Sequence, residues 1–154
     1  MARTGKGAVR FDQLFTYKLS LLVKLTDRET AAVYRKHTRL GLSEARAITI
    51  IGREQPLRVQ HLADFGSLDK SQASRVAVSL ARRGLIRKVD DATDRRTSAI
   101  LLTPAGMRMY EKLVALAVGR NEAILQPLGS QQRAELMRLL DTVLAHVAAA
   151  AADA

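Results

Sequence analysis

The hydrophobic period of this sequence changes at Gly84, and this change constrains the fold more than any other feature. Before the glycine, apolar residues recur at helical spacing over 73–80. After it, Leu85 to Val89 and Ser98 to Thr103 are short runs typical of β-strands, separated by a polar loop over 90–97. We therefore predict a helix that ends at Gly84, where glycine easily forms a left-handed cap, followed by a β-hairpin with a long tip.

Helical periodicity also covers most of the remaining chain. Ser43 is a candidate N-cap for a second helix, which Gln55-Pro56 should close. Thr103 followed by Pro104 is a typical start for the helix after the hairpin. The predicted helices span residues 11–37, 43–55, 58–65, 69–83, 104–126 and 131 onward. The expected fold class is mainly α with a small β-hairpin wing.

The helix predicted over 69–83 has two faces of different chemistry. At about 100° per residue, one stripe is apolar and consists of Ala73, Val76, Ala77 and Leu80. The opposite face carries Ser71, Ser74, Arg75, Val78 and Arg82. Short polar side chains let a helix approach a partner closely, and an arginine can reach guanine edges or phosphates. We expect this outer face to enter a DNA major groove; a plain solvated helix face is the alternative.

This helix and the hairpin together resemble the recognition helix and wing of MarR-family transcription regulators. The segment that carries the resemblance is LDKSQASRVAVSLARRGLIRKVDDATDRRTSAILLTPAG, Leu68 to Gly106. It contains the Ser74-Arg75 pair, a Gly-Leu-Ile after the helix, the Asp-x-x-Asp-x-Arg of the wing, and Leu-Thr-x-x-Gly. The order of elements extends the similarity to nearly the whole chain. The resemblance implies one domain over 1–154, with a winged helix-turn-helix module over 41–103 and dimerisation helices over 11–37 and 104–148.

The same resemblance assigns DNA contacts to individual residues. In the family the wing arginine enters the minor groove, which implies this role for Arg96; a narrow groove attracts guanidinium groups by its negative potential. Asp94 would brace the wing tip by pairing with an arginine, and Arg95 would lie near a phosphate. Sequence selection would fall to the start of the helix, at Lys70, Ser71, Gln72, Ser74 and Arg75.

The distribution of charge favours a partner with negative charge, nucleic acid before membrane, and the resemblance implies double-stranded DNA. The net charge is +10. Residues 1–40 hold nine Lys or Arg against three acids, residues 41–96 hold eleven against seven, and residues 97–154 hold five against five. Counterion release makes contacts between such a basic region and phosphates favourable. A basic surface that only keeps the protein soluble is the alternative.

The last predicted helix has an apolar stripe that needs a partner. Its members recur at helical spacing and are Leu136, Leu139, Leu140, Val143, Leu144 and Val147. The winged module is too small to cover the first helix and the last two, so we expect a homodimer, as the resemblance also implies. A two-fold dimer predicts a pseudo-palindromic DNA site. Packing within one chain is the alternative.

The resemblance further implies regulation by a small molecule. Many such regulators are repressors that leave DNA when a phenolic or aromatic acid binds between the dimerisation helices and the winged module. An anionic effector needs cationic or hydrogen-bonding groups, and the candidates are Tyr17, Lys24, Arg46 and His61. A DNA-binding protein without a sensor, or a protein-interaction adaptor that does not bind DNA, are the alternative functions.

The sequence contains few residues in patterns typical of an enzyme or a metal site. The chain has no cysteine, which excludes disulfides and thiolate metal sites. His37, His61 and His146 fall on separate predicted helices without ligand spacing, and no phosphate loop or nucleophile elbow occurs. We expect no enzyme activity and no cofactor, with a zinc site of histidine and carboxylates as a minor alternative. Without a signal-peptide pattern or a long apolar run, the expected location is the cytoplasm.

Overall fold

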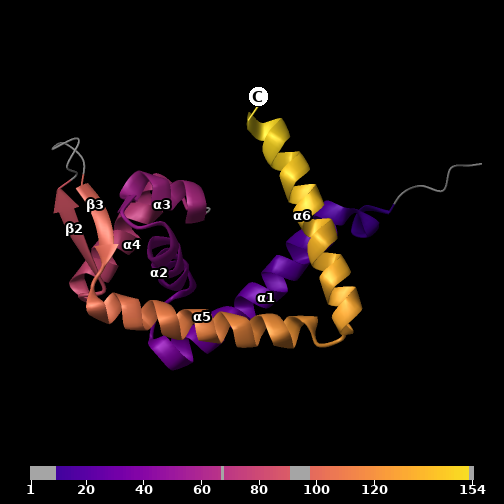
Figure 1. Ribbon diagram of the computed structural model, residues 1–154, viewed down its shortest axis with the longest axis horizontal. Coiled ribbons are helices and arrows are strands. Elements are labelled where there is room, and N and C mark those ends of the chain that lie inside the picture. The colour runs from indigo at the N-terminus through magenta and orange to yellow at the C-terminus, as the bar shows by residue number, and fades with distance from the viewer. Residues whose placement is uncertain (1–9, 67, 91–97, 153–154) are drawn as a thin grey trace, which may run out of the picture. The chain divides into compact units, whose positions relative to one another are not determined.

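The computed structural model of the protein describes residues 10–66, 68–90 and 98–152 (Figure 1). The chain forms two compact units, Met1–Ala117 and Val118–Ala154. In chain order the elements are η1 (Phe11–Gln13), α1 (Phe15–Thr38), α2 (Leu42–Glu54), β1 (Leu57–Arg58), α3 (Val59–Gly66), α4 (Lys70–Arg82), β2 (Ile86–Asp90), β3 (Ser98–Leu102), α5 (Pro104–Leu125) and α6 (Ser130–Ala152). The predicted fold class, mainly α with a small β-hairpin wing, is confirmed.

The three strands form one antiparallel sheet in the order β1-β3-β2. Strands β2 and β3 are the predicted hairpin, in which Val89 pairs with Ala99. The third strand was not predicted: Leu57 pairs with Ile100 and Arg58 with Ala99. Assigning Arg58 to a helix was therefore wrong. Its pairing partner lies far along the chain, and a two-residue strand is too short to show a hydrophobic period.

Two predicted helix starts also differ from the structure. The first long helix begins at Phe15, because Leu14 is extended and separates it from the 3-10 turn before it. The second helix has Gly41 as its N-cap in place of Ser43. The reason is a hydrogen bond 2.9 Å long from the Gly41 backbone N–H to Oε2 of Glu44, which satisfies a free amide at the helix start.

The predicted boundaries around the hairpin are confirmed. Asp69 is the N-cap of α4. Gly84 follows that helix with a φ of 68°, the left-handed conformation that glycine adopts without strain. Pro104 is the first residue of α5, and the hydroxyl of Thr103 accepts a hydrogen bond from Gly106 N at 3.0 Å. Local sequence signals therefore define the limits of α4 and α5 well.

The hydrophobic core lies in the first unit. Its members come from α1 to α5 and from the sheet, and α2 contributes Ile48 and Ile51, which are fully buried. Burying a side chain of this size stabilises the fold by about 1.5–3 kcal/mol. The largest fully buried side chains are Leu40, Ile48, Ile51, Leu62, Leu80, Ile100 and Leu113. The winged module thus has a core that holds α4 and the hairpin in place.

The terminal helices carry most of the exposed large hydrophobic residues. On α6 the exposed large hydrophobics are Met137, Leu139, Val143, Leu144 and Val147. In η1 and α1 they are concentrated between Phe11 and Leu25. None of the described side chains from Val118 to Ala152 is buried. Both terminal apolar surfaces are thus open to a partner in the single chain.

Candidate nucleic-acid interface

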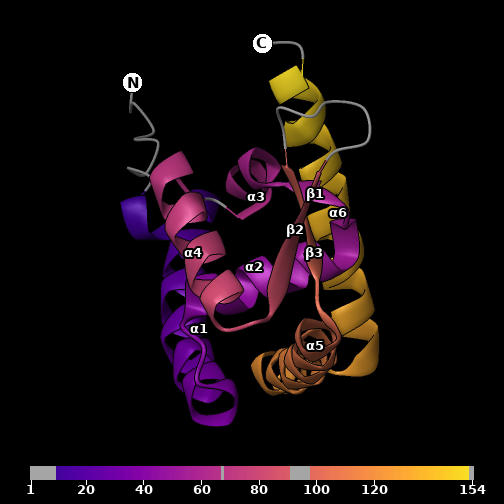
Figure 2. The same cartoon turned by 90° about the vertical axis from the view of Figure 1, so that its left-hand side faces the viewer.

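The candidate interface begins with α4, which lies on the same side of the first unit as the hairpin strands (Figure 2). The helix packs against α2 and α3 and leads directly into β2. A helix and a neighbouring hairpin in this order are the two DNA-contacting elements of a winged helix.

The two faces of α4 are arranged as the sequence predicts. On the inner face Ala73, Ala77 and Leu80 are at most 2% exposed. The outer face carries exposed side chains of Ser71, Ser74, Arg75, Val78 and Arg82. Lys70 and Gln72 at the start of the helix are also exposed. The residues predicted to select a DNA sequence thus share one exposed helical surface.

The side chain of Gln72 has a structural partner at the start of α4. Its Oε1 accepts a hydrogen bond from Asp69 N at 3.1 Å, while Asp69 Oδ1 accepts one from Gln72 N at 2.7 Å. This reciprocal pair is a capping box, which satisfies two amides that the helix leaves unpaired. The role of Gln72 in base recognition stays a prediction, and any such contact has to keep or replace this cap.

The predicted wing-tip contacts cannot be placed. Asp94, Arg95 and Arg96 lie outside the described residues. The strands that lead to the tip are described and paired as far as Asp90 and Ser98.

The base of the wing is joined to the end of α4 by the Leu-Thr-x-x-Gly motif. The Thr103 hydroxyl donates to the Gly84 carbonyl at 2.6 Å, and Thr103 N donates to the Leu85 carbonyl at 3.0 Å. A Cβ added at Gly106 would lie 1.9 Å from the Leu85 carbonyl oxygen, so the start of α5 needs glycine there. This part of the motif thus joins α4, the hairpin and α5.

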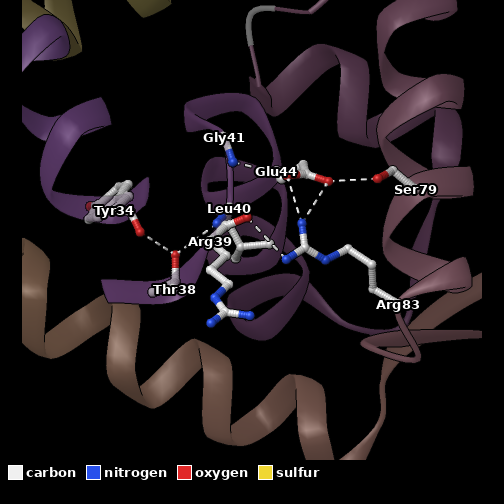
Figure 3. Close-up of polar contacts among 8 residues, drawn as sticks. All are labelled: Tyr34, Thr38, Arg39, Leu40, Gly41, Glu44, Ser79 and Arg83. Atoms are coloured by element: carbon white, nitrogen blue, oxygen red, sulfur yellow. Dashed lines mark hydrogen bonds and ion pairs between the residues drawn. The ribbon is translucent and has the colours of Figure 1, made fainter. Parts of the chain in front are cut away.

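A polar cluster that the sequence analysis missed joins α4 to α2 (Figure 3). The Ser79 hydroxyl donates to Glu44 Oε1 at 2.6 Å, and Arg83 Nη1 lies 3.2 Å from Glu44 Oε2. Arg83 Nη2 also donates to the carbonyl of Arg39 at 3.1 Å. The partners of Glu44 on α4 are 35 and 39 residues away, so no local spacing identifies them. The one local signal for Glu44 is its position three residues after Gly41. That spacing indicates a cap at the start of α2 and says nothing about Ser79 or Arg83.

The environment of Glu44 favours its ionised form. Partial burial raises the pKa of Glu44, but hydrogen bonds from Ser79 and from the Gly41 backbone, together with the charge of Arg83, outweigh this effect. The pKa of the Glu44 carboxyl therefore lies below its usual value. A carboxylate that stays charged keeps both partners on α4 bound at neutral pH.

The four residues predicted to bind an effector come from three helices, and their joint role stays a prediction. Tyr17 and Lys24 are on α1, Arg46 is on α2 and His61 is on α3. No described contact joins two of them, and Arg46 forms an ion pair with Asp27, 2.5 Å between Nη2 and Oδ1. A surface hollow of about 840 Å³ lies elsewhere and is lined by Leu128 and by α6 residues between Gln131 and Leu139.

Two other classes of site are absent from the described part of the chain. There, His, Cys, Asp and Glu side chains form no cluster of three or more that could hold a metal ion. No helix within the same residues is long and apolar enough to cross a membrane.

Comparison with known proteins connects this geometry to one family. A family model described as MarR family matches residues 40–97. A search of curated proteins gave no match. The matched region begins just after α1, ends just before β3, and contains the recognition-helix candidate α4.

Solved structures extend the likeness to the terminal helices. A probable transcriptional regulator from Pseudomonas aeruginosa is 26% identical, with a TM-score of 0.70 over 87% of this chain and 99% of that one. A MarR/EmrR family transcriptional regulator from Acinetobacter sp. ADP1 is 25% identical, with a TM-score of 0.77 over 90% and 98%. Apo wild-type MarR from E. coli, at 18% identity, shares the fold with a TM-score of 0.76 over 85% and 96%.

Proposed function

We propose that the chain is a transcriptional regulator of the MarR family, whose members bind DNA as dimers, and that it acts as a homodimeric repressor. The dimer binds a pseudo-palindromic operator and leaves it when a small aromatic acid binds. Residues at the start of α4 read the bases, and Arg96 of the wing enters the minor groove, with Arg95 at a phosphate and Asp94 bracing the tip.

One observation carries the DNA-binding part of this proposal: the outer face of α4 is exposed and carries short polar and basic side chains, while its inner face is buried. Ser71 and Ser74 are short enough to let the helix approach base edges, and Arg75 beside them can bind guanine or phosphate. Counterion release adds affinity from the basic residues before Thr97.

The exposed apolar surfaces of the terminal helices support the homodimer. An isolated chain would leave the residues between Phe11 and Leu25 in water, together with five large hydrophobics on α6. Apolar patches of this kind usually mark an interface, and a symmetric dimer covers both copies of each patch at once. The dimer then presents two copies of α4 to successive half-sites.

A sensorless DNA-binding protein remains a second candidate, and the ion pair of Arg46 favours it. An anionic effector at Arg46 has to displace Asp27, which already neutralises the guanidinium. In that case the protein acts by occupying DNA alone.

An effector can lower DNA affinity only by binding the DNA-incompetent arrangement of the two winged modules more tightly than the competent one.

The test is fluorescence anisotropy of the wild type on duplexes tiled across the DNA that flanks its own gene, with and without a panel of aromatic acids. We expect sequence-selective binding with a steep negative salt dependence, weakened by one compound. Selective binding that no compound in the panel weakens favours the sensorless candidate. Affinity no higher than for random DNA contradicts operator binding at that locus.

Matched variants test the role of α4 directly. Ser74→Ala combined with Arg75→Ala should weaken selective binding at least about tenfold, because one bidentate base contact contributes about 1–3 kcal/mol. Arg108→Ala removes the same charge from an exposed position on α5 and serves as the control. Sedimentation of both variants checks that the dimer is intact. Equal binding by the two variants contradicts the assignment of α4.

A further inference from the structure

Val78 on α4 differs from every other large hydrophobic residue in the middle of the chain. Among the side chains that the structure describes between Thr26 and Leu113, it is the one large hydrophobic that is exposed, at 44%. The other exposed large hydrophobics lie in the terminal segments, from Phe11 to Leu25 and from Val114 to Val147. A dimer interface on the terminal helices does not account for Val78.

The position of Val78 on the helix is central to the candidate interface. At about 100° per residue, it lies nearly opposite Leu80, which is fully buried in the core. Ser71, Arg75, Val78 and Arg82 follow one another at spacings of four, three and four residues, so they form one exposed stripe along α4. A valine thus lies between two arginines on the face that points away from the core.

Nothing in the fold of the single chain explains a valine there. A β-branched residue is less favourable than alanine in a helix, and Val78 gains little burial in exchange. The side chain is also too isolated for a protein-docking patch, because its exposed neighbours on α4 are polar or charged or, at Ala81, small. A partner that matches this part of α4 has one small apolar group opposite Val78 in an otherwise polar and anionic surface.

The major groove of DNA offers such a group, since the 5-methyl of thymine is the apolar feature of its base edges. We propose that Val78 is a specificity-determining residue that packs against a thymine methyl in each half-site. The flanking arginines then contact phosphates or guanine beside that thymine. This inference rests on the proposed function, and it adds a base preference that the polar residues of α4 do not supply.

Replacing thymine by deoxyuridine tests the contact, because uracil pairs identically and lacks only the methyl group. An operator duplex is first selected from random sequences with the wild type, and each thymine is then replaced symmetrically in both half-sites. We expect one position at which the replacement weakens wild-type binding about fourfold per half-site, the value for burying one methyl-sized group. Val78→Ala should bind the thymine and uracil duplexes equally.

Val76→Ala is the matched control, since Val76 is half-buried and packs against the core two residues earlier. This variant should lose stability and still prefer thymine at the same position. Two outcomes overturn the inference and leave the proposed function intact. In the first, the wild type binds selectively but tolerates uracil at every position. In the second, the preference for thymine persists in Val78→Ala. Failure of the wild type to select any sequence overturns both.

Discussion

The guanidinium of Arg83 lies 3.2 Å from the carboxylate of Glu44, and this pair joins the end of α4 to the start of α2. Arg83 also donates to the carbonyl of Arg39, in the turn between α1 and α2. One arginine therefore connects the recognition-helix candidate to α2 and to the turn that precedes α2. The tilt of α4 on the module depends on these bonds as well as on its buried inner face.

Glu44→Gln should destabilise the fold by about 1–2 kcal/mol, because it removes the charge from hydrogen bonds to Ser79 and Arg83. Denaturant unfolding measures the change. Glu54→Gln is the control on the same helix, since its bond to Arg53 is exposed and local and such pairs contribute little. Equal losses in the two variants would contradict a special role for the Glu44 cluster.

Stability should depend on pH through the same carboxylate. Because the pKa of Glu44 is lowered in the folded state, its contribution is complete above the ordinary value of 4.5 and is lost as the pH falls through the lowered value. The difference in unfolding free energy between wild type and Glu44→Gln should therefore shrink below pH 4.5. Unfolding curves from neutral to acid pH test this, and a constant difference would argue against it.

Two glycines in α5 should respond oppositely to alanine. At Gly106 an added Cβ would lie 1.9 Å from the backbone oxygen of Leu85, so we expect a loss of about 3 kcal/mol. At Gly119 nothing lies within 4 Å of the added Cβ, and alanine should stabilise the helix by about 0.5–1 kcal/mol. Thermal unfolding distinguishes the two; a tolerated Gly106→Ala would show that Leu85 can move.

Leu144→Glu should dissociate the proposed dimer. Leu144 is 65% exposed on α6, so in a single chain the change affects little packing, whereas in an interface it buries a charge. Sedimentation velocity should show monomers with unchanged helical content by circular dichroism. Thr142→Glu, on the same helix at an exposed polar position, is the control and should remain dimeric. A dimeric Leu144→Glu would exclude this residue from the interface.

Asp27→Asn tests whether Arg46 can bind an effector. The substitution removes the carboxylate that neutralises Arg46, so an aromatic acid bound at this guanidinium should bind more tightly. Titration calorimetry with benzoate and its hydroxylated derivatives measures the effect, with Asp12→Asn as the control at a carboxylate paired with Arg10. Unchanged affinity would remove Arg46 from the candidate effector site.

Features that depend on residues close together along the chain could be predicted from the sequence. The period of apolar residues in α4 defined its buried and exposed faces, and Asp69 and Gly84 marked its two ends. The hairpin followed from two short apolar runs around a polar loop. These predictions hold because helix faces, caps and turns depend on residues a few positions apart.

Contacts between distant segments could not be predicted in this way, because they depend on how the elements pack in three dimensions. The pairing of β1 with β3, the bond from Leu102 N to Gln55 across 47 positions, and the cluster around Glu44 all depend on how the elements pack. The same is true of Arg46, whose predicted role in effector binding competes with an ion pair to Asp27 on α1. These residues interact because folding brings them close together in space. The spacing of apolar residues along the chain does not predict that proximity.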